Sequence, residues 1–209
     1  MTPRPLGPLA WTGVALALGL PALLGLLPGH WPPDTWALHP SAGLHQSPLS
    51  LWTCAWLHAN TRHLVANLAG LTLILSLGWI LKLHPRAALA WLLAWPITHL
   101  ALLLDPRLDT YYGLSGVLHA GLSIIATSLI TQANPDRAAK GTALYGWALL
   151  LGMLAKCWLE NPDWQALLPR PGLDMNAAPM SHWAGTLVGI GITLTLALRR
   201  GHCCSKSRP

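Results

Sequence analysis

The sequence predicts an all-α, polytopic membrane protein built as a bundle of six transmembrane helices. Apolar residues make up 53% of the chain and charged residues only 10%, whereas an ordinary soluble domain is roughly 25% charged. A helix needs about 20 apolar residues to cross a hydrocarbon core about 30 Å thick. Six apolar runs approach or reach this length, and we expect them to form one domain over residues 1–209: residues 6–27, 61–81, 87–104, 111–131, 141–159 and 177–198.

The first run, residues 6–27, has two interpretations. Arg4 before it and Pro28-Gly29 after it are compatible with a secretory signal peptide. The run is long for the apolar part of such a peptide, however, and no A-x-A-like cleavage site follows it. We therefore expect a membrane anchor.

The remaining runs alternate with loops whose basic residues define an orientation. One side of the membrane would carry most of the 13 Lys and Arg residues, namely Arg4, Lys82, Arg86, Arg137, Lys140, Arg199, Arg200, Lys206 and Arg208. The other side would carry Arg62, Arg107 and Arg170. Because Lys and Arg favour the cytoplasmic side, we expect both termini in the cytoplasm. The net charge of +6 then requires no nucleic-acid partner.

The expected cytoplasmic tail, residues 199–209, is basic and contains Cys203-Cys204. Two interpretations apply to this pair, a reduced pair of thiols or an acylation site beside the membrane.

Two polar side chains lie at matching depth in different runs. Ser115, in Gly113-Leu114-Ser115-Gly116, is four residues into the fourth run, and His182 is five residues into the sixth. An imidazole can take the proton of a hydroxyl that is otherwise a weak nucleophile. Gly185 and Gly189 share a helix face with His182, and a Gly-x-x-x-Gly spacing permits close helix approach. We expect Ser115 and His182 to meet; the alternative is that these glycines only pack helices.

A third polar group begins the second run. His63 and Asn67 are four residues apart and hence share a helix face, and His58 precedes them. Neutral imidazole and amide donors suit the stabilisation of an oxyanion without a fixed charge in the membrane. The alternative is that they only join helices by hydrogen bonds.

Carboxylates are absent from the interior of the runs, so the sequence predicts a Ser-His dyad without a third, acidic member. Lys156 and Glu160 form an i,i+4 pair at the outer end of the fifth run. They are interpreted either as an interfacial ion pair or as a contact for substrate or a lipid head group.

No His-Glu dipeptide and no mid-span acid occurs, which argues against a zinc protease, an aspartyl protease and a cation transporter. We expect no metal and no cofactor.

Together the three motifs resemble those of the rhomboid intramembrane serine proteases: His58-x4-His63-x3-Asn67, Gly113-x-Ser115-Gly116, and His182-x2-Gly185-x3-Gly189. The resemblance implies a six-span bundle with Ser115 as nucleophile and His182 as base. It implies an oxyanion hole formed by His63, Asn67 and the Ser115 N–H. His58, Gly113, Gly116, Gly185 and Gly189 would support this site. His119 stands where many members have a tyrosine that stacks on the histidine, and it is also a second candidate base.

Within that family the chain looks most like the rhombosortases. This resemblance implies an inner-membrane endopeptidase of bacteria with its site open to the periplasm. Its partners would be single-span proteins that end in Gly-Gly, a hydrophobic span and a basic tail, and the acyl-enzyme would pass to water or to an amine. The alternative is an inactive rhomboid-like protein that escorts membrane helices, although such proteins commonly lose the serine or the histidine and both are present here.

Overall fold

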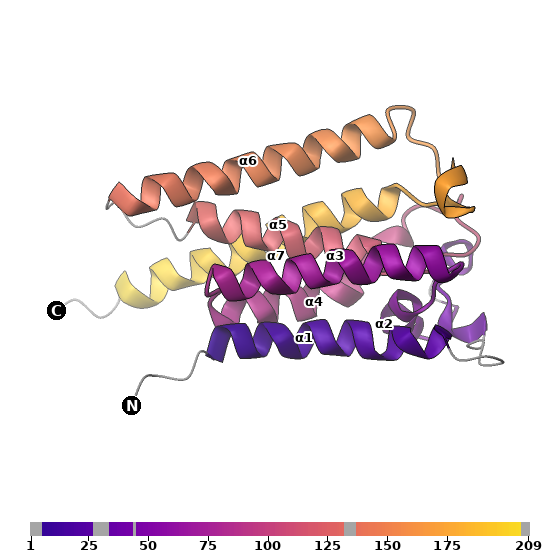
Figure 1. The fold of residues 1–209 in the computed structure, drawn as a ribbon, viewed down its shortest axis with the longest axis horizontal. Helices are drawn as coiled ribbons and strands as arrows, with labels where there is room; N and C mark the ends of the chain where they lie inside the picture. Colours follow the sequence, from indigo (N-terminus) through magenta and orange to yellow (C-terminus); the bar gives the residue numbers. More distant parts are fainter. Residues whose placement is uncertain (1–5, 27–33, 44, 132–136, 206–209) are drawn as a thin grey trace.

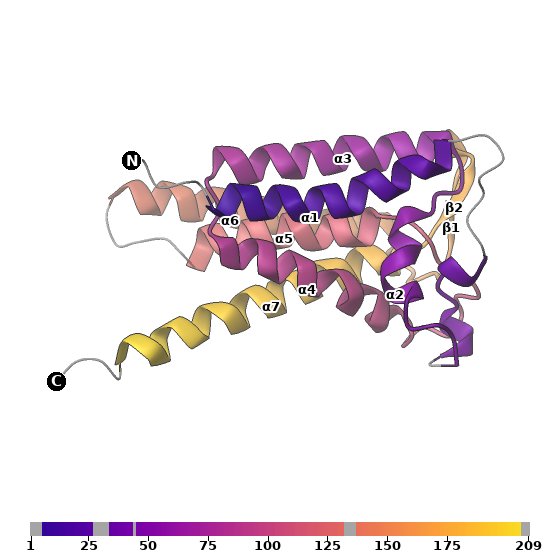
Figure 2. The ribbon, with the colours of Figure 1, turned by 90° about the horizontal axis from the view of Figure 1, so that it is seen from below.

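A computed structural model describes residues 6–26, 34–43, 45–131 and 137–205. Six long helices lie side by side along one axis (Figures 1 and 2): α1 (Leu6–Ala22), α3 (Thr61–Ile80), α4 (Pro85–Leu102), α5 (Ser115–Thr131), α6 (Arg137–Glu160) and α7 (Met180–Ser205). Arg4, Lys206 and Arg208 lie outside the described residues, as does Pro28-Gly29. The structure also describes no side chains for the tail from residue 199.

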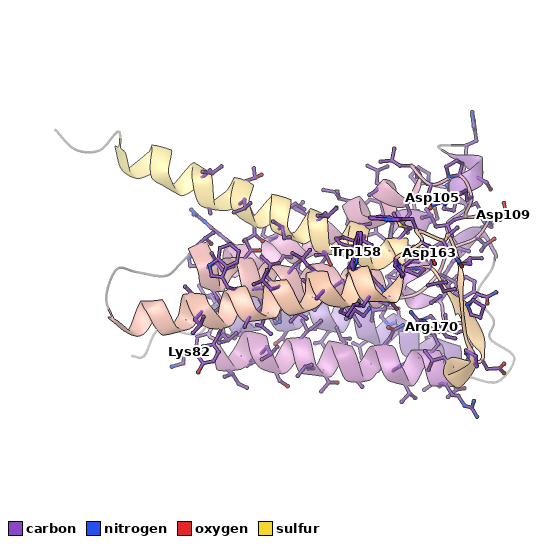
Figure 3. The ribbon with its side chains drawn as sticks, turned by 90° about the horizontal axis from the view of Figure 1, so that it is seen from above. Lys82, Asp105, Asp109, Trp158, Asp163 and Arg170 are labelled. Atoms are coloured by element: carbon purple, nitrogen blue, oxygen red, sulfur yellow. The ribbon has the colours of Figure 1, made fainter. Side chains whose placement is uncertain are left out.

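One end of the bundle carries the irregular structure and is called the hairpin end. It contains α2 (Ser50–Thr53) and an antiparallel pair of strands, β1 (Leu168–Arg170) and β2 (Met175–Ala177). Figure 3 shows Asp105, Asp109, Asp163 and Arg170 at this end and Lys82 at the opposite end. The predominantly helical fold agrees with the prediction, and the two short strands between α6 and α7 are a detail that the sequence did not predict.

The described residues contain three helices long and apolar enough to cross a membrane. They are Thr61–Ile80, Thr142–Glu160 and Met180–Leu198. Two other apolar helices, Leu6–Ala22 and Ser115–Thr131, are shorter, with 17 residues each. A predominantly helical membrane protein is thus supported, while the six-span arrangement stays a prediction.

Two expected spans begin later than the apolar pattern indicates. Residues 111–114 are not helical, because Tyr111 exchanges backbone hydrogen bonds with Leu38 (2.7 and 2.9 Å) and Gly113 has φ +132°. Ser115 is therefore the first residue of α5 rather than a residue one turn inside it. In the same way α7 begins at Met180, because Ala177 belongs to β2. A run of apolar residues does not distinguish an extended segment from the helix that continues it.

Helix α5 occupies the centre of the bundle and packs against α3, α4, α6 and α7. At Gly185 and Gly189 the backbone of α7 lies directly against α5. A Cβ on Gly185 would overlap the Gly116 carbonyl oxygen, and one on Gly189 would meet the Ala120 carbonyl oxygen at 2.6 Å. Small residues allow this approach, and in lipid such close packing replaces the hydrophobic effect as the force that joins helices.

Tryptophan side chains connect the other helices. The Trp11 indole N–H donates to the Ile74 carbonyl (3.1 Å), and the Trp91 N–H donates to the Val117 carbonyl (2.9 Å). The two rings also stack on each other, with centroids 4.3 Å apart. These contacts join α1 to α3 and α4 to α5 by bonds that lipid cannot replace.

The glycine contact gives a stability prediction. Gly185→Ala is expected to lower the apparent melting temperature of the detergent-solubilised protein, because its Cβ has no space beside Gly116. Overpacking of this kind typically costs about 1–3 kcal/mol. Gly191→Ala on the same helix is the control, since nothing lies within 4 Å of its Cβ. That variant is expected to gain roughly 0.5–1 kcal/mol. Equal melting temperatures for the two variants would contradict the close approach of α5 and α7.

Candidate active site

The backbone around Ser115 is fixed from two sides. The Gly113 N–H donates to the Cys54 carbonyl (2.9 Å), and the Tyr111 hydroxyl donates to the Gly113 carbonyl (3.1 Å). The φ of +132° at Gly113 disfavours any residue with a Cβ, and a Cβ there would also lie 3.0 Å from His63 Cε1. Because Ser115 begins α5, its N–H has no acceptor within the helix and lies at the positive end of the helix dipole.

The structure brings Ser115 and His182 together. His182 Nε2 lies 3.1 Å from Ser115 Oγ, and the imidazole is 7% exposed. His182 is the third residue of α7, so the two side chains come from the hairpin ends of the two helices that pack backbone to backbone. The distance is within the range for proton transfer between a nucleophile and its base.

A carboxylate lies beside this pair, which corrects the expected dyad. Glu160 Oε2 is 2.7 Å from His182 Nδ1, on the opposite side of the ring from Ser115. Glu160 is the last residue of α6. The sequence predicts a dyad because no carboxylate lies in the interior of a span, and Glu160 lies just beyond the end of the fifth run. The fold nevertheless sets the end of α6 beside the start of α7.

The carboxylate determines which nitrogen of His182 carries the proton. An ionised carboxylate only accepts hydrogen bonds, so Nδ1–H must donate to Glu160 and Nε2 is left free to accept from Ser115. Lys156 Nζ also lies 3.0 Å from Nδ1, but its ammonium has acceptors of its own. They are Glu160 Oε2 at 2.5 Å and His119 Nε2 at 3.1 Å. Hydroxyl, imidazole and carboxylate therefore follow one another in the order found in Ser-His-acid triads.

The second oxygen of Glu160 is also engaged. Arg170 Nη2 donates to Oε1 at 2.5 Å, and this residue belongs to β1. Glu160 is thus held by Lys156 from its own helix and by Arg170 from the hairpin. The Glu160 side chain is 12% exposed, whereas that of Lys156 is 45% exposed.

His119 stacks on His182, with ring centroids 4.1 Å apart and planes at 15°. Its Nδ1–H donates to the Ser115 carbonyl (2.8 Å), and its Nε2 accepts from Lys156. Both nitrogens are therefore occupied, and the partner of the Ser115 hydroxyl is His182. His119 packs against the flat face of the base and limits its rotation.

Hydrogen-bond donors face Ser115 from α3. The amide nitrogen of Asn67 is buried and has no hydrogen-bond partner among the described residues. His63 Nδ1 accepts from the Ala59 N–H (3.3 Å), so the proton of a neutral ring lies on Nε2. Asn67 and His63 both line the same cavity as Ser115. A buried donor without a partner is costly unless a ligand satisfies it.

His58 lies behind His63 and does not line the cavity. Its ring meets that of His63 edge to face at 4.9 Å, and its Nδ1–H donates to the Trp56 carbonyl (3.2 Å). Burial lowers the pKa of His58 to about 4, and the neighbouring His63 adds to this effect. His58 is therefore neutral at physiological pH and supports His63 by packing.

The cavity that joins these groups has a volume of about 620 Å³. Its lining includes Ser115, His182, Glu160 and the two α3 donors, together with residues of the β1–β2 hairpin. Ser181 also lines it and has a buried hydroxyl without a partner among the described residues. No group of three or more His, Cys, Asp or Glu side chains in the described part of the chain is arranged to hold a metal ion.

Most residues proposed from the sequence lie in or beside this one site. Gly116, Gly185 and Gly189 form the helix contact, and Gly113 forms the turn before Ser115. Sequence reasoning missed Arg170 and the role of Glu160. The i,i+4 spacing of Lys156 and Glu160 was visible, but no local pattern indicates that the end of one helix meets the start of the next.

No model of a known protein family matches this chain, and a search of curated proteins finds no match to its sequence. The site geometry is therefore the main support for a function.

The site predicts a reactive serine. A fluorophosphonate is expected to form one covalent adduct, on Ser115, detected by intact mass. Glu160→Gln is expected to slow this labelling by about 100-fold or more, because Gln can donate to Nδ1 and so stabilise the wrong tautomer of His182.

Two variants serve as controls for this labelling. Arg170→Gln removes one bond to Glu160 but leaves the His182 contact, so it should slow labelling far less. Ser181→Ala should leave the adduct in place, because Ser181 lines the same cavity without a base. Labelling of Glu160→Gln at the wild-type rate would remove Glu160 from the catalytic arrangement.

Proposed function

We propose that the protein is an intramembrane serine endopeptidase of the rhomboid type. The observation that carries this proposal is the line from Ser115 Oγ through His182 to Glu160, with distances of 3.1 and 2.7 Å, beside the unpaired donor of Asn67. The sequence motifs add a resemblance to rhomboid proteases, and the apolar helices are compatible with a membrane location.

The chemistry follows from the positions of these groups. Ser115 Oγ attacks a peptide carbonyl carbon while His182 Nε2 takes the hydroxyl proton, and Glu160 stabilises the resulting imidazolium. The carbonyl oxygen becomes an oxyanion that accepts hydrogen bonds from Asn67, from His63 Nε2–H and from the Ser115 N–H. Collapse breaks the C–N bond, and the amine leaves with the proton from His182. Water or an amine then attacks the acyl-enzyme, with His182 as base.

The substrates we propose are membrane proteins with a C-terminal Gly-Gly, a hydrophobic span and a basic tail, as in rhombosortases. Glycine weakens a helix and presents little bulk, which suits a segment that must unwind to place its carbonyl beside Ser115. We also propose that the protein lies in a bacterial inner membrane, with both termini in the cytoplasm and the site open to the periplasm.

The test is cleavage of a tagged substrate of this design, co-expressed with each variant, with products measured by intact mass. Wild type is expected to cleave, and Ser115→Ala and His182→Ala are expected to abolish cleavage. His119→Ala should only slow it, because His119 positions the base. The product mass distinguishes hydrolysis from transfer to an amine.

A substrate in which Leu-Leu replaces Gly-Gly is the control, and it should be cleaved poorly. Cleavage by Ser115→Ala would overturn the protease proposal. Stable capture of the substrate without cleavage by wild type would instead favour the helix-escort function.

A further inference from the structure

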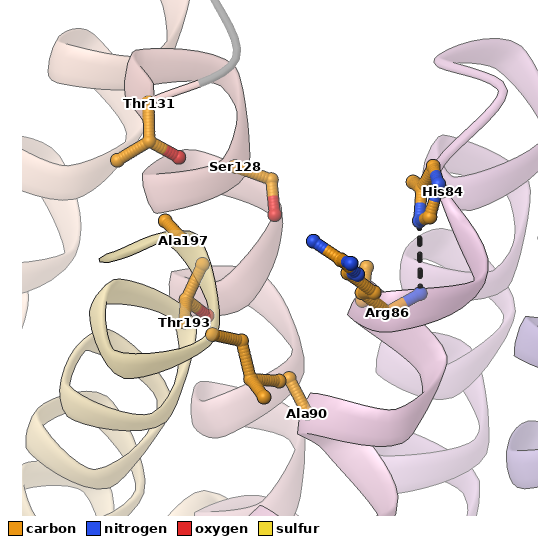
Figure 4. A pocket seen from close by; sticks show the side chains of 9 residues that line it. His84, Arg86, Ala90, Ser128, Thr131, Thr193 and Ala197 are labelled. Carbon is orange, nitrogen blue, oxygen red and sulfur yellow. Dashed lines mark hydrogen bonds between the residues drawn. The ribbon is translucent and has the colours of Figure 1, made fainter. Parts of the chain in front are cut away.

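A second cavity lies at the end of the bundle opposite the hairpin, between α4, α5 and α7 (Figure 4). Its volume is about 190 Å³, below the roughly 300–1,000 Å³ of pockets that hold drug-sized ligands. The cavity therefore suits a small group rather than a nucleotide or a cofactor. It shares no residue with the serine site.

Two hydrogen-bond donors converge on this cavity. Figure 4 shows the Arg86 side chain of α4 and the Ser128 hydroxyl of α5 facing each other across it. Ser128 is only 3% exposed, and its side chain lines the cavity. The Arg86 guanidinium has no ion pair with the described residues, and only its backbone N–H is engaged, by His84 Nδ1 (3.2 Å).

The rest of the lining excludes a cation and favours an anion. Among the residues that the structure describes, no acidic side chain lines the cavity. The Thr131 and Thr193 hydroxyls donate to carbonyls of their own helices, at 2.9 and 2.8 Å, whereas the donors of Arg86 and Ser128 face each other across the cavity. Helix α4 begins at Pro85, which adds the positive end of its dipole. A guanidinium beside a hydroxyl donor matches the oxygens of a phosphate group.

The apolar part of the lining points to the source of that phosphate. Ala87, Ala90, Leu196 and Ala197 form the apolar part of the wall, and His84 also lines the cavity. A free phosphate ion would leave this surface uncovered, whereas a phospholipid would cover it with its glycerol and upper acyl carbons. Basic pockets between membrane helices are known to bind acidic lipid head groups.

We propose that this cavity binds the phosphate group of an anionic phospholipid in the leaflet at the end of the bundle opposite the serine site. Arg86 makes a paired hydrogen bond to two phosphate oxygens, and Ser128 donates to one of them. The proposal does not depend on protease activity, because the two sites lie at opposite ends of the molecule.

The test uses the full-length protein in a neutral detergent, titrated with dioctanoyl phosphatidylglycerol. The probes for comparison are dioctanoyl phosphatidylcholine and inorganic phosphate at the same concentrations. Binding is measured by the rise in apparent melting temperature and by native mass spectrometry. Phosphatidylglycerol is expected to bind wild type most tightly, and inorganic phosphate alone is expected to give no protection.

The decisive variant is Arg86→Gln, which should weaken phosphatidylglycerol binding by roughly tenfold or more. Ser128→Ala should weaken it by about threefold. Lys82→Gln is the matched control, because Lys82 is an exposed cation at the same end that does not line the cavity. Without lipid, Arg86→Gln should unfold like wild type.

Three results would overturn the proposal. The first is an equal loss of binding in Arg86→Gln and Lys82→Gln, which would indicate general surface attraction. The second is equal affinity for phosphatidylglycerol and phosphatidylcholine. The third is protection by inorganic phosphate equal to that by the lipid.

Discussion

The serine site depends on the contact between the backbones of α5 and α7. Where Gly185 lies against the Gly116 carbonyl, and Gly189 against Ala120 and the Ser123 hydroxyl, α7 has no room for a side chain. His182 is one helical turn before Gly185, and Ser115 directly precedes Gly116, so this contact sets their 3.1 Å separation. Any side chain between the helices would move the base away from the hydroxyl. In a bilayer this contact must come from packing and hydrogen bonds, because lipid supplies no hydrophobic force between helices.

A second layer of interactions fixes the orientation of the base. Glu160 of α6 contacts Nδ1 of His182, and His119 of α5 stacks on the His182 ring. Lys156 forms hydrogen bonds to both His119 and Glu160. Arg170 extends this network to the hairpin that covers the site. The position of one imidazole is thus determined by three helices and a strand. This is the kind of support that keeps a catalytic group within a fraction of an ångström of its working geometry.

The sequence was sufficient where the physical signal is local. Apolar runs located the helices, and the spacing of His182, Gly185 and Gly189 predicted a close helix contact that the structure contains. It was insufficient where the signal is not local. The non-helical start at Tyr111 arises from pairing with Leu38, more than 70 positions away, and Glu160 joins His182 through the fold of a hairpin. A single sequence does not indicate that a carboxylate at the border of a span turns inward. It therefore predicted Ser115 and His182 alone, whereas the structure places Glu160 beside them.

The contact with Glu160 places the proton of neutral His182 on Nδ1 and leaves Nε2 free to accept from Ser115. Nitrogen NMR of the protein labelled with 15N at histidine tests this directly, with the His182 signals assigned by comparison with His182→Ala. We expect a protonated Nδ1 and an unprotonated Nε2 in the wild type, and a mixture of tautomers in Glu160→Gln. A wild-type spectrum with the proton on Nε2 would contradict it, because Nε2 could then not act as the base for Ser115.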